Sequence, residues 1–215
     1  MRDYLVKAIL EEKIVAIVRG IPDKQILDIT RALLEGGVRF VEVALDHSQG
    51  GGWRETLQSI RLLKAEMGGK VEIGAGTVLT PEQVDCAQQA GARYIISPNV
   101  NPDVIARTRE LGMVSIPGAF TPSEIAMANE RGADIVKLFP ADALGPRYVK
   151  AVNAPLGHIP LMATGGVTAE NIPSFLDAGA ACFGVGGSLV SAKPLDGSVQ
   201  CITDKARAMR TAVSR

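Results

Sequence analysis

Short apolar runs recur along the 215-residue chain, and longer segments of mixed polarity separate them. Most of these runs lack the polar alternation of a half-exposed strand, which is typical of parallel strands that are covered on both faces. The segments between them have the length and composition of helices. We therefore expect eight strands, at Ile14–Arg19, Phe40–Leu45, Val71–Thr77, Tyr94–Pro98, Met113–Gly118, Ile135–Pro140, Leu161–Gly166 and Cys182–Gly187.

Local signals mark the ends of the helices. Glycine is the usual residue just past a helix C-terminus, where a left-handed backbone is needed. Helix starts carry capping signals, in which a threonine and a side chain three residues later satisfy free backbone amides. The junction glycines are Gly37, Gly91, Gly112, Gly132 and Gly179, and the capping signals run from Thr80 to Gln83 and from Thr121 to Glu124, with weaker ones at Asn101 and Thr168.

Eight strands that alternate with helices predict an α/β fold, the (β/α)8 barrel of the TIM type. An open, doubly wound sheet is the competing fold, but eight evenly spaced units favour closure. Residues 1–12 are expected to form an extra N-terminal helix across the bottom of the barrel. No linker or break in composition occurs, so we expect a single domain over residues 1–215.

Composition narrows the class of protein. The 23 basic and 23 acidic residues balance without a long run of either sign, which argues against nucleic acid or a membrane surface as partner. No apolar stretch approaches the roughly 18 residues that span a bilayer. The first residues are mixed and charged rather than signal-like, so a cytoplasmic location is expected. Three widely spaced cysteines and two histidines form no metal-ligand pattern, so no metal site is expected.

Lys137 is the most informative single residue. It lies within the apolar run Ile135–Pro140, and strand alternation places it on one face with Ile135 and Phe139. Burial of an unpaired ammonium is costly, so a lysine in such a run typically has a lowered pKa and serves as a neutral nucleophile. The alternative is a structural lysine that is ion-paired or whose head group escapes at the strand end.

Further polar residues lie on separate strands, and the C-terminal ends of barrel strands carry the chemistry in such folds. Glu42 is a candidate general acid and base, or a partner that only neutralises Lys137. Arg19 is a candidate clamp for a carboxylate or phosphate, or a strand-end arginine in solvent. Thr77 follows glycines that would let a substrate approach the backbone, although a simple turn threonine is also compatible with the pattern.

Glycine clusters follow the seventh and eighth expected strands, where barrels of this type often bind phosphate. Backbone amides in such loops donate hydrogen bonds without side-chain bulk. The alternative is that the glycines form turns that merely need positive φ. The cluster residues are Gly165, Gly166, Gly186, Gly187 and Ser188.

Eight short motifs, in order along essentially the whole chain, resemble the 2-keto-3-deoxy-6-phosphogluconate (KDPG) aldolase family of class I aldolases on (β/α)8 barrels. One motif alone would be weak, whereas eight in this order are specific. The motifs are Ile17-Val18-Arg19-Gly20, Gly36-Gly37-Val38 leading into Val41-Glu42-Val43, Gly74-Ala75-Gly76-Thr77-Val78-Leu79, Ile96-Ser97-Pro98, Ile116-Pro117-Gly118, Lys137-Leu138-Phe139-Pro140-Ala141, Thr164-Gly165-Gly166-Val167 and Gly184-Val185-Gly186-Gly187-Ser188-Leu189.

The resemblance implies a reaction through Lys137, which would form a Schiff base with the 2-keto carbon of the substrate. Glu42 would shuttle protons during carbinolamine formation and cleavage of the C3–C4 bond. The products would be pyruvate and, in the namesake reaction, glyceraldehyde 3-phosphate. The protonated imine is the electron sink, so the resemblance implies no metal or organic cofactor, and it leads us to expect a homotrimer.

The resemblance also implies how the substrate is held. Arg19 and Thr77 would bind the pyruvate-side carboxylate, and the two glycine clusters with Ser188 would bind the distal phosphate. Other members of the substrate site would be Phe139, Pro98 and Thr164, of which Phe139 would pack beside the imine.

Two positions bear on the identity of the substrate. Many KDPG aldolases have an arginine that contacts the substrate carboxylate where this chain has Asp46, and an aspartate there would repel that carboxylate. Related 6-phosphogalactonate enzymes without that arginine use the strand-one arginine, here Arg19. Thr164, however, is KDPG-like. His47 is either a substrate contact at the mouth or a simple loop residue.

The leading hypothesis is therefore cleavage of a KDPG-like 2-keto-3-deoxy-6-phospho sugar acid. The alternatives are an aldolase of the 6-phosphogalactonate type, an aldolase for 4-hydroxy-2-oxoglutarate, and a non-catalytic barrel that binds a phosphosugar.

Overall fold

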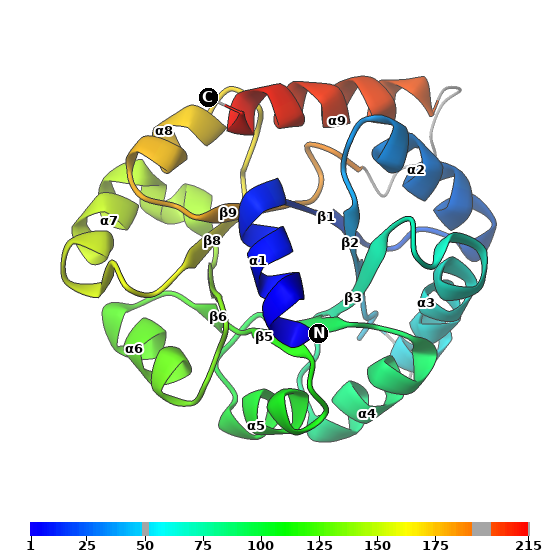
Figure 1. Ribbon diagram of the computed structural model, residues 1–215, viewed down its shortest axis with the longest axis horizontal. Helices are drawn as coiled ribbons and strands as arrows, with labels where there is room; N and C mark the ends of the chain where they lie inside the picture. Colours follow the sequence, from blue (N-terminus) through cyan, green and yellow to red (C-terminus); the bar gives the residue numbers. More distant parts are fainter. Residues whose placement is uncertain (49–51, 191–198, 215) are drawn as a thin grey trace.

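Parallel strands form a barrel that helices surround on its outer face in a computed structural model, which describes residues 1–48, 52–190 and 199–214 (Figure 1). Strands and helices alternate along the chain after an initial helix, as the sequence predicts. The elements are α1 (Arg2–Glu12), β1 (Ile14–Val18), α2 (Asp23–Glu35), β2 (Phe40–Ala44), α3 (Trp53–Met67), β3 (Glu72–Gly76), α4 (Pro81–Ala90), β4 (Tyr94–Ile96), α5 (Pro102–Glu110), β5 (Val114–Ile116), β6 (Gly118–Ala119), α6 (Pro122–Glu130), β7 (Val136–Leu138), α7 (Ala141–Leu156), β8 (Leu161–Thr164), α8 (Ile172–Asp177), β9 (Cys182–Val185) and α9 (Gln200–Val213).

The strands pair in the order β5-β4-β3-β2-β1-β9-β8-β7-β6, and every pair is parallel. The fifth expected strand is divided into β5 and β6 by Pro117, which has no amide hydrogen for a sheet ladder. β5 pairs with β4 and β6 pairs with β7, and the carbonyl of Pro117 accepts the Lys137 amide at 2.9 Å. The divided strand therefore closes the ring, and the predicted TIM-type barrel is confirmed.

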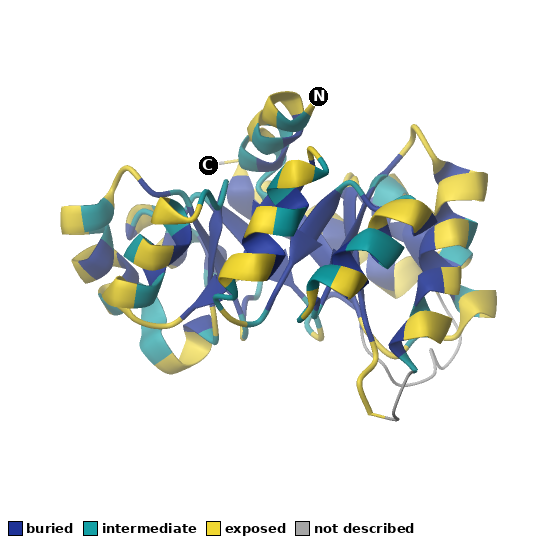
Figure 2. Ribbon diagram, turned by 90° about the horizontal axis from the view of Figure 1, so that it is seen from below, coloured by how far each residue is buried: buried dark blue, intermediate teal, exposed yellow. Residues whose placement is uncertain are grey.

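The N-terminal helix α1 lies across one end of the barrel (Figures 1 and 2). Its buried residues Leu5 and Ile9 join an apolar cluster with residues of the strands, among them Tyr94 and Ile96. The expected helix at the barrel bottom is thus confirmed. A larger apolar cluster lies between the outer face of the barrel and the helices.

The helix ends follow the expected chemistry with two differences. At α6, Thr121 and Glu124 form the complete capping box. At α4, Thr80 accepts the Gln83 amide, but the Gln83 side chain accepts the amide of Leu79 rather than that of Thr80. Thr168 exchanges hydrogen bonds with Asn171 in a turn, so α8 begins later than the sequence signal indicates, at Ile172. The junction glycines all have positive φ, from 69° at Gly112 to 109° at Gly91.

No helix in the described parts of the chain is long and apolar enough to cross a bilayer.

Candidate active site

A pocket of about 490 Å³ opens at the C-terminal ends of β1, β7, β8 and β9. Most of the predicted site residues line it, although they come from distant parts of the sequence. Glu42, Thr77 and Pro98 do not line it and are described separately below. The residues of the pocket are Ile17, Arg19, Lys137, Phe139, Thr164, Gly165, Gly166, Val167, Thr168, Gly184, Gly186, Gly187 and Ser188.

Lys137 is the central residue of β7, and its side chain points into this pocket from the barrel wall. It is 5% exposed, and its Nζ lies 4.7 Å from the centroid of the Phe139 ring. Burial lowers the pKa of the Lys137 ammonium, while the charge of Glu42 opposes the shift and that of Arg19 adds to it. The amine is therefore easier to deprotonate than that of an ordinary lysine, as a nucleophile requires.

Glu42 lies on β2 and is 1% exposed. Burial raises the pKa of its carboxyl group, and the positive charges of Lys137 and Arg19 partly offset this rise. Its Oε2 atom has no hydrogen-bond partner among the described residues. A high pKa for the acid and a low pKa for the amine bring the two groups closer in proton affinity, so Glu42 can both give and take a proton beside Lys137.

Arg19 and Thr77, the two residues expected to form a carboxylate clamp, lie within hydrogen-bond distance of each other just beyond the C-terminal ends of β1 and β3. The Nη2 atom of Arg19 donates to Oγ1 of Thr77 at 3.2 Å. Arg19 is exposed and lines the pocket, and its guanidinium has further donors for a ligand. Thr77 has a φ of 57°, and its carbonyl lies 2.8 Å from Nε2 of His47.

The glycine clusters form two adjoining turns. The amides of Leu189 and Val190 both donate to the Gly186 carbonyl, so Gly187 and Ser188 begin a helical turn whose first amides have no acceptor within the turn. The Ser188 hydroxyl donates to the Val167 carbonyl at 2.5 Å, which joins the loops after β8 and β9. It is therefore the amide of Ser188, rather than its hydroxyl, that suits an anion.

Gly165 and Gly166 have φ values of 100° and 63°, so their turn needs residues that tolerate a left-handed backbone. A Cβ atom on Gly166 would also lie 2.3 Å from the Cβ atom of Asp142 at the start of α7. The turn interpretation of these two glycines therefore holds, and it does not compete with a role in anion binding.

Thr164 ends β8 and is 3% exposed. Its Oγ1 atom has no hydrogen-bond partner in the described structure, and a Cβ atom on Gly184 would lie 2.5 Å from it. A buried, unpaired hydroxyl in a pocket wall is suited to a polar group of a ligand. Pro98 does not line the pocket; its carbonyl lies against Gly118, the residue of β6 that pairs with Lys137.

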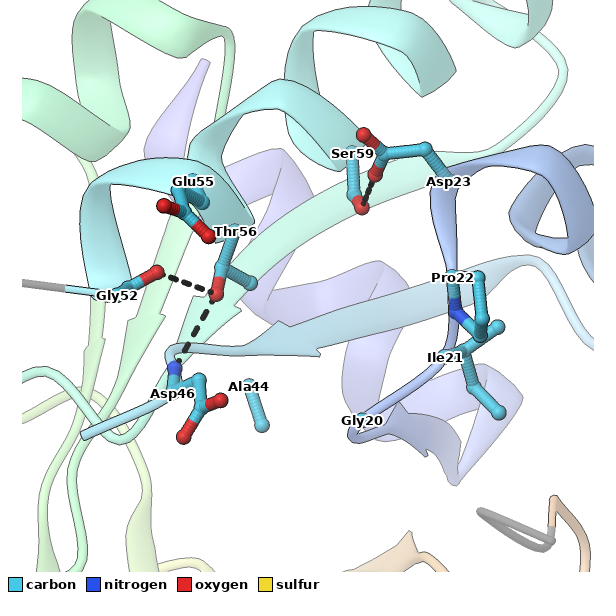
Figure 3. Close-up of a pocket in the computed structure, with 10 residues that line it drawn as sticks. All are labelled: Gly20, Ile21, Pro22, Asp23, Ala44, Asp46, Gly52, Glu55, Thr56 and Ser59. Atoms are coloured by element: carbon cyan, nitrogen blue, oxygen red, sulfur yellow. Dashed lines mark hydrogen bonds between the residues drawn. The ribbon is translucent and has the colours of Figure 1, made fainter. Parts of the chain in front are cut away.

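The loop after β2 contains the contacts that sequence reasoning missed. Asp46 lies at the edge of a second pocket of about 350 Å³, between the β1–α2 and β2–α3 loops (Figure 3). Its carboxylate accepts the amide of Ser48 at 2.8 Å, and bonds to Ser48 hold its pKa below the usual range. The only sequence signal was the departure from the family pattern at this position. No group of three or more His, Cys, Asp or Glu side chains among the described residues could hold a metal ion.

The geometry thus unites a buried amine of lowered pKa, a buried acid, a cationic clamp and two amide-rich turns. Such a set can form an imine with a keto acid, move protons at the bound substrate and hold anionic groups at both ends of it.

Comparisons with known proteins agree with this chemistry. The family model for KDPG and KHG aldolase matches residues 6–204. The 2-dehydro-3-deoxy-6-phosphogalactonate aldolase of Escherichia coli is 41% identical over 83% of this chain and 85% of its own. The 2-dehydro-3-deoxy-phosphogluconate aldolase of Treponema pallidum is 37% identical over 69% of this chain and 68% of its own.

Solved structures agree as well. A native KDPGal structure has a TM-score of 0.84 at 38% identity and covers 94% of each chain. The KDPG aldolase of Legionella pneumophila, with pyruvate captured as a covalent carbinolamine, has a TM-score of 0.84 at 26% identity and covers 95% of this chain and 97% of that one. The chain therefore belongs to the family of KDPG and KHG aldolases, carbon–carbon lyases that act on small keto acids.

Proposed function

We propose that this aldolase cleaves a 2-keto-3-deoxy-6-phospho sugar acid to pyruvate and glyceraldehyde 3-phosphate through a Schiff base at Lys137. The observation that carries the proposal is the burial of Lys137 in the pocket with a lowered pKa, together with a buried Glu42 of raised pKa. The carbinolamine of the Legionella relative supports the same chemistry here.

The first half of the reaction forms the imine. The neutral Lys137 amine attacks C2 of the keto acid, while Glu42 relays a proton from nitrogen to oxygen, so that a neutral carbinolamine results and Glu42 stays protonated. Glu42 then protonates the departing hydroxyl group. Water leaves, and the nitrogen lone pair completes the protonated imine.

The second half breaks the C3–C4 bond. The Glu42 carboxylate takes the proton of the C4 hydroxyl, the bonding pair moves into the imine, and the aldehyde separates from an enamine of pyruvate. Glu42 returns that proton to C3 of the enamine. Water then attacks the imine, with Glu42 again relaying the protons, and releases pyruvate and the free lysine.

Two anion sites would orient the substrate along this path. Arg19 and Thr77 would hold the carboxylate next to C2, because a guanidinium and a hydroxyl match its two oxygens. The amides of the two glycine turns would hold the terminal phosphate. Phe139 would cover the imine, since its ring already contacts the Lys137 amine.

The galactonate form of the substrate is the first candidate. The galactonate aldolase of Escherichia coli is 41% identical to this chain, whereas a gluconate aldolase from Treponema pallidum and a probable galactonate aldolase from Rhizobium meliloti are 37% and 36% identical. The residue at position 46 also favours the galactonate form, because Asp46 stands where many gluconate aldolases have an arginine that contacts the substrate carboxylate. The two sugar acids differ in configuration at C4 and yield the same products.

The gluconate form is the second candidate, and Thr164 is the observation in its favour. Its unpaired hydroxyl lies in the pocket wall, where it would select one orientation of the C4 hydroxyl. A third candidate, 4-hydroxy-2-oxoglutarate, lacks the phosphate that the glycine turns would bind. The proposal also includes a single domain, a homotrimer and a cytoplasmic location, all carried over from the sequence.

Three measurements test the proposal. Incubation with pyruvate and borohydride should add a reduced pyruvate adduct to Lys137, which mass spectrometry detects as added mass. If no adduct is found, the alternative of a non-catalytic barrel that binds a phosphosugar would be favoured. Steady-state cleavage of the two phosphorylated epimers and of 4-hydroxy-2-oxoglutarate should give the highest kcat/KM for the galactonate form. Inorganic phosphate should compete with it, and lack of competition would instead favour the unphosphorylated substrate.

A further inference from the structure

Thr77 has a backbone conformation that threonine rarely adopts. Its φ of 57° lies in the left-handed region, where the Cβ atom crowds the backbone and a β-branched side chain fits poorly. The other non-glycine residue with positive φ in the described chain is Lys13, at the end of α1. Backbone strain of this kind persists where surrounding contacts enforce it, and it gathers at functional sites.

His47 supplies such a contact. Its Nε2 atom lies 2.8 Å from the Thr77 carbonyl oxygen, and since a carbonyl only accepts, this nitrogen donates. The last backbone bond between the ends of β2 and β3 runs from the Leu45 amide to the Gly76 carbonyl at 2.8 Å. Just beyond that bond, the imidazole of His47 joins the two strand ends and fixes the direction of the Thr77 carbonyl.

Both neighbours of His47 are themselves held. The amide of Asp46 donates to Oγ1 of Thr56 on α3 at 3.2 Å, as Figure 3 shows. The amide of Ser48 donates to the Asp46 carboxylate at 2.8 Å, which closes a tight turn around His47. The aspartate thus has a structural task in the loop, and the imidazole is presented to Thr77 from a fixed turn.

The contact between His47 and Thr77 bears on the carboxylate clamp formed by Arg19 and Thr77. The conformation of Thr77 decides where its hydroxyl points, and that hydroxyl accepts from Arg19 at 3.2 Å. We infer that His47 is a positioning residue, which holds Thr77 in its left-handed conformation and so sets the affinity of the Arg19–Thr77 pair for the substrate carboxylate. The inference rests on the proposed function, because that function gives the pair its ligand.

Pyruvate itself is the probe for the test, since it carries the carboxylate and forms the imine without the rest of the substrate. The readout is the pyruvate concentration that gives half-maximal borohydride trapping at Lys137. His47→Ala should raise this concentration about threefold to tenfold, as the loss of one hydrogen bond would, with the maximal trapping unchanged. His47→Gln should restore it to within about twofold, because the glutamine amide can donate from a similar position.

His158 offers the matched control, since it is the only other histidine and is also exposed. It lies before the N-terminal end of β8, whereas the pocket opens at the C-terminal ends of the strands. His158→Ala should leave the half-maximal concentration unchanged. Equal values for the wild type and His47→Ala would overturn the inference, and so would a His47→Gln protein as impaired as His47→Ala.

A double-mutant cycle separates an effect through Thr77 from an independent one. Thr77→Val removes the hydroxyl but keeps the β-branched shape, and it should raise the half-maximal concentration by itself. Adding His47→Ala to Thr77→Val should change the value by less than about twofold, because His47 would have no hydroxyl left to position. Additive effects would show that His47 acts without Thr77 and would refute the inference. Failure of the wild type to trap pyruvate would instead refute the proposed function.

Discussion

The carboxyl group of Glu42 occupies space that exists only because residue 76 is glycine. A Cβ atom on Gly76 would lie 1.6 Å from Oε1 of Glu42, far inside van der Waals contact. The φ of Gly76 is not positive, so the strand itself does not demand glycine at this position. Glycine is therefore needed at position 76 to leave room for the Glu42 carboxyl group. Gly76 on β3 pairs with Ala44 on β2, the strand that carries Glu42.

We predict that Gly76→Ala displaces Glu42 and lowers kcat by about 100-fold or more, within the range of general acid–base catalysis. The protein should fold, because the clash is with a side chain that can move. Glu42→Ala provides the reference. Adding Gly76→Ala to Glu42→Ala should cost little further activity, whereas two independent losses would mean that Gly76 acts in another way.

The buried acid should also destabilise the fold at neutral pH. The raised pKa of Glu42 means that the folded state binds this proton more tightly than the unfolded state, whose carboxyl titrates at about 4.3. The stability linked to this proton is complete below that pH and is lost as the pH rises through the folded-state pKa. Glu42→Gln should therefore raise Tm at pH 7 to 8, with a gain that shrinks as the pH falls toward 4.5.

Thermal unfolding at several pH values measures this effect. Each kcal/mol corresponds to roughly 2–4 °C of Tm in a chain of this size. A Tm gain that is constant over the pH range would contradict a raised pKa of Glu42, because the gain in stability would then not depend on the protonation of its carboxyl group. Trapping of pyruvate should become much slower in the same variant, which ties the gain in stability to a loss of function.

Thr164 should show the same opposition between stability and function. Thr164→Val removes a buried hydroxyl that has no partner in the described structure, so Tm should rise. At the same time, kcat/KM for the preferred C4 epimer should fall about tenfold, because one hydrogen bond to the substrate is lost. Thr30 on α2 is the matched control, since its Oγ1 is also buried and unpaired among the described residues. Thr30→Val should raise Tm without changing kcat/KM. Equal kinetics for Thr164→Val and the wild type would remove Thr164 from the substrate site.

Arg19 should govern affinity rather than turnover. Arg19→Met removes a charge-assisted bond to the carboxylate, and KM for the keto acid should rise about 10- to 100-fold with a smaller change in kcat. Arg19→Lys should recover only part of the loss, because an ammonium cannot bond a carboxylate and the Thr77 hydroxyl in the same forked geometry. An unchanged KM in Arg19→Met would place the carboxylate elsewhere.

The strands and most helix ends could be predicted because they depend on neighbours in sequence. The junction glycines have positive φ and Thr121 forms its capping box with Glu124, since both features need only a few consecutive residues. The meeting of Lys137, Thr164 and Arg19 followed from the barrel, whose closure brings the ends of separate strands together.

The remaining features depend on contacts between loops that share no local pattern. Nothing in the order of residues links His47 to the Thr77 carbonyl or the Asp46 carboxylate to the turn around it. The position of Pro98 outside the pocket also involves a contact with a residue distant in sequence, Gly118 on β6. The late start of α8 likewise reflects a bond pair between Thr168 and Asn171 that competes with the helix.

The helix α1 covers the bottom of the barrel, and the pocket with Lys137 opens at the other end, beyond the C-terminal ends of the strands. In the proposed reaction, pyruvate is still covalently bound to Lys137 after the C3–C4 bond has broken. By that mechanism the phosphorylated aldehyde would depart before pyruvate. In the direction of synthesis the order would reverse, and pyruvate would bind first, with the aldehyde as the second substrate of an ordered bimolecular reaction.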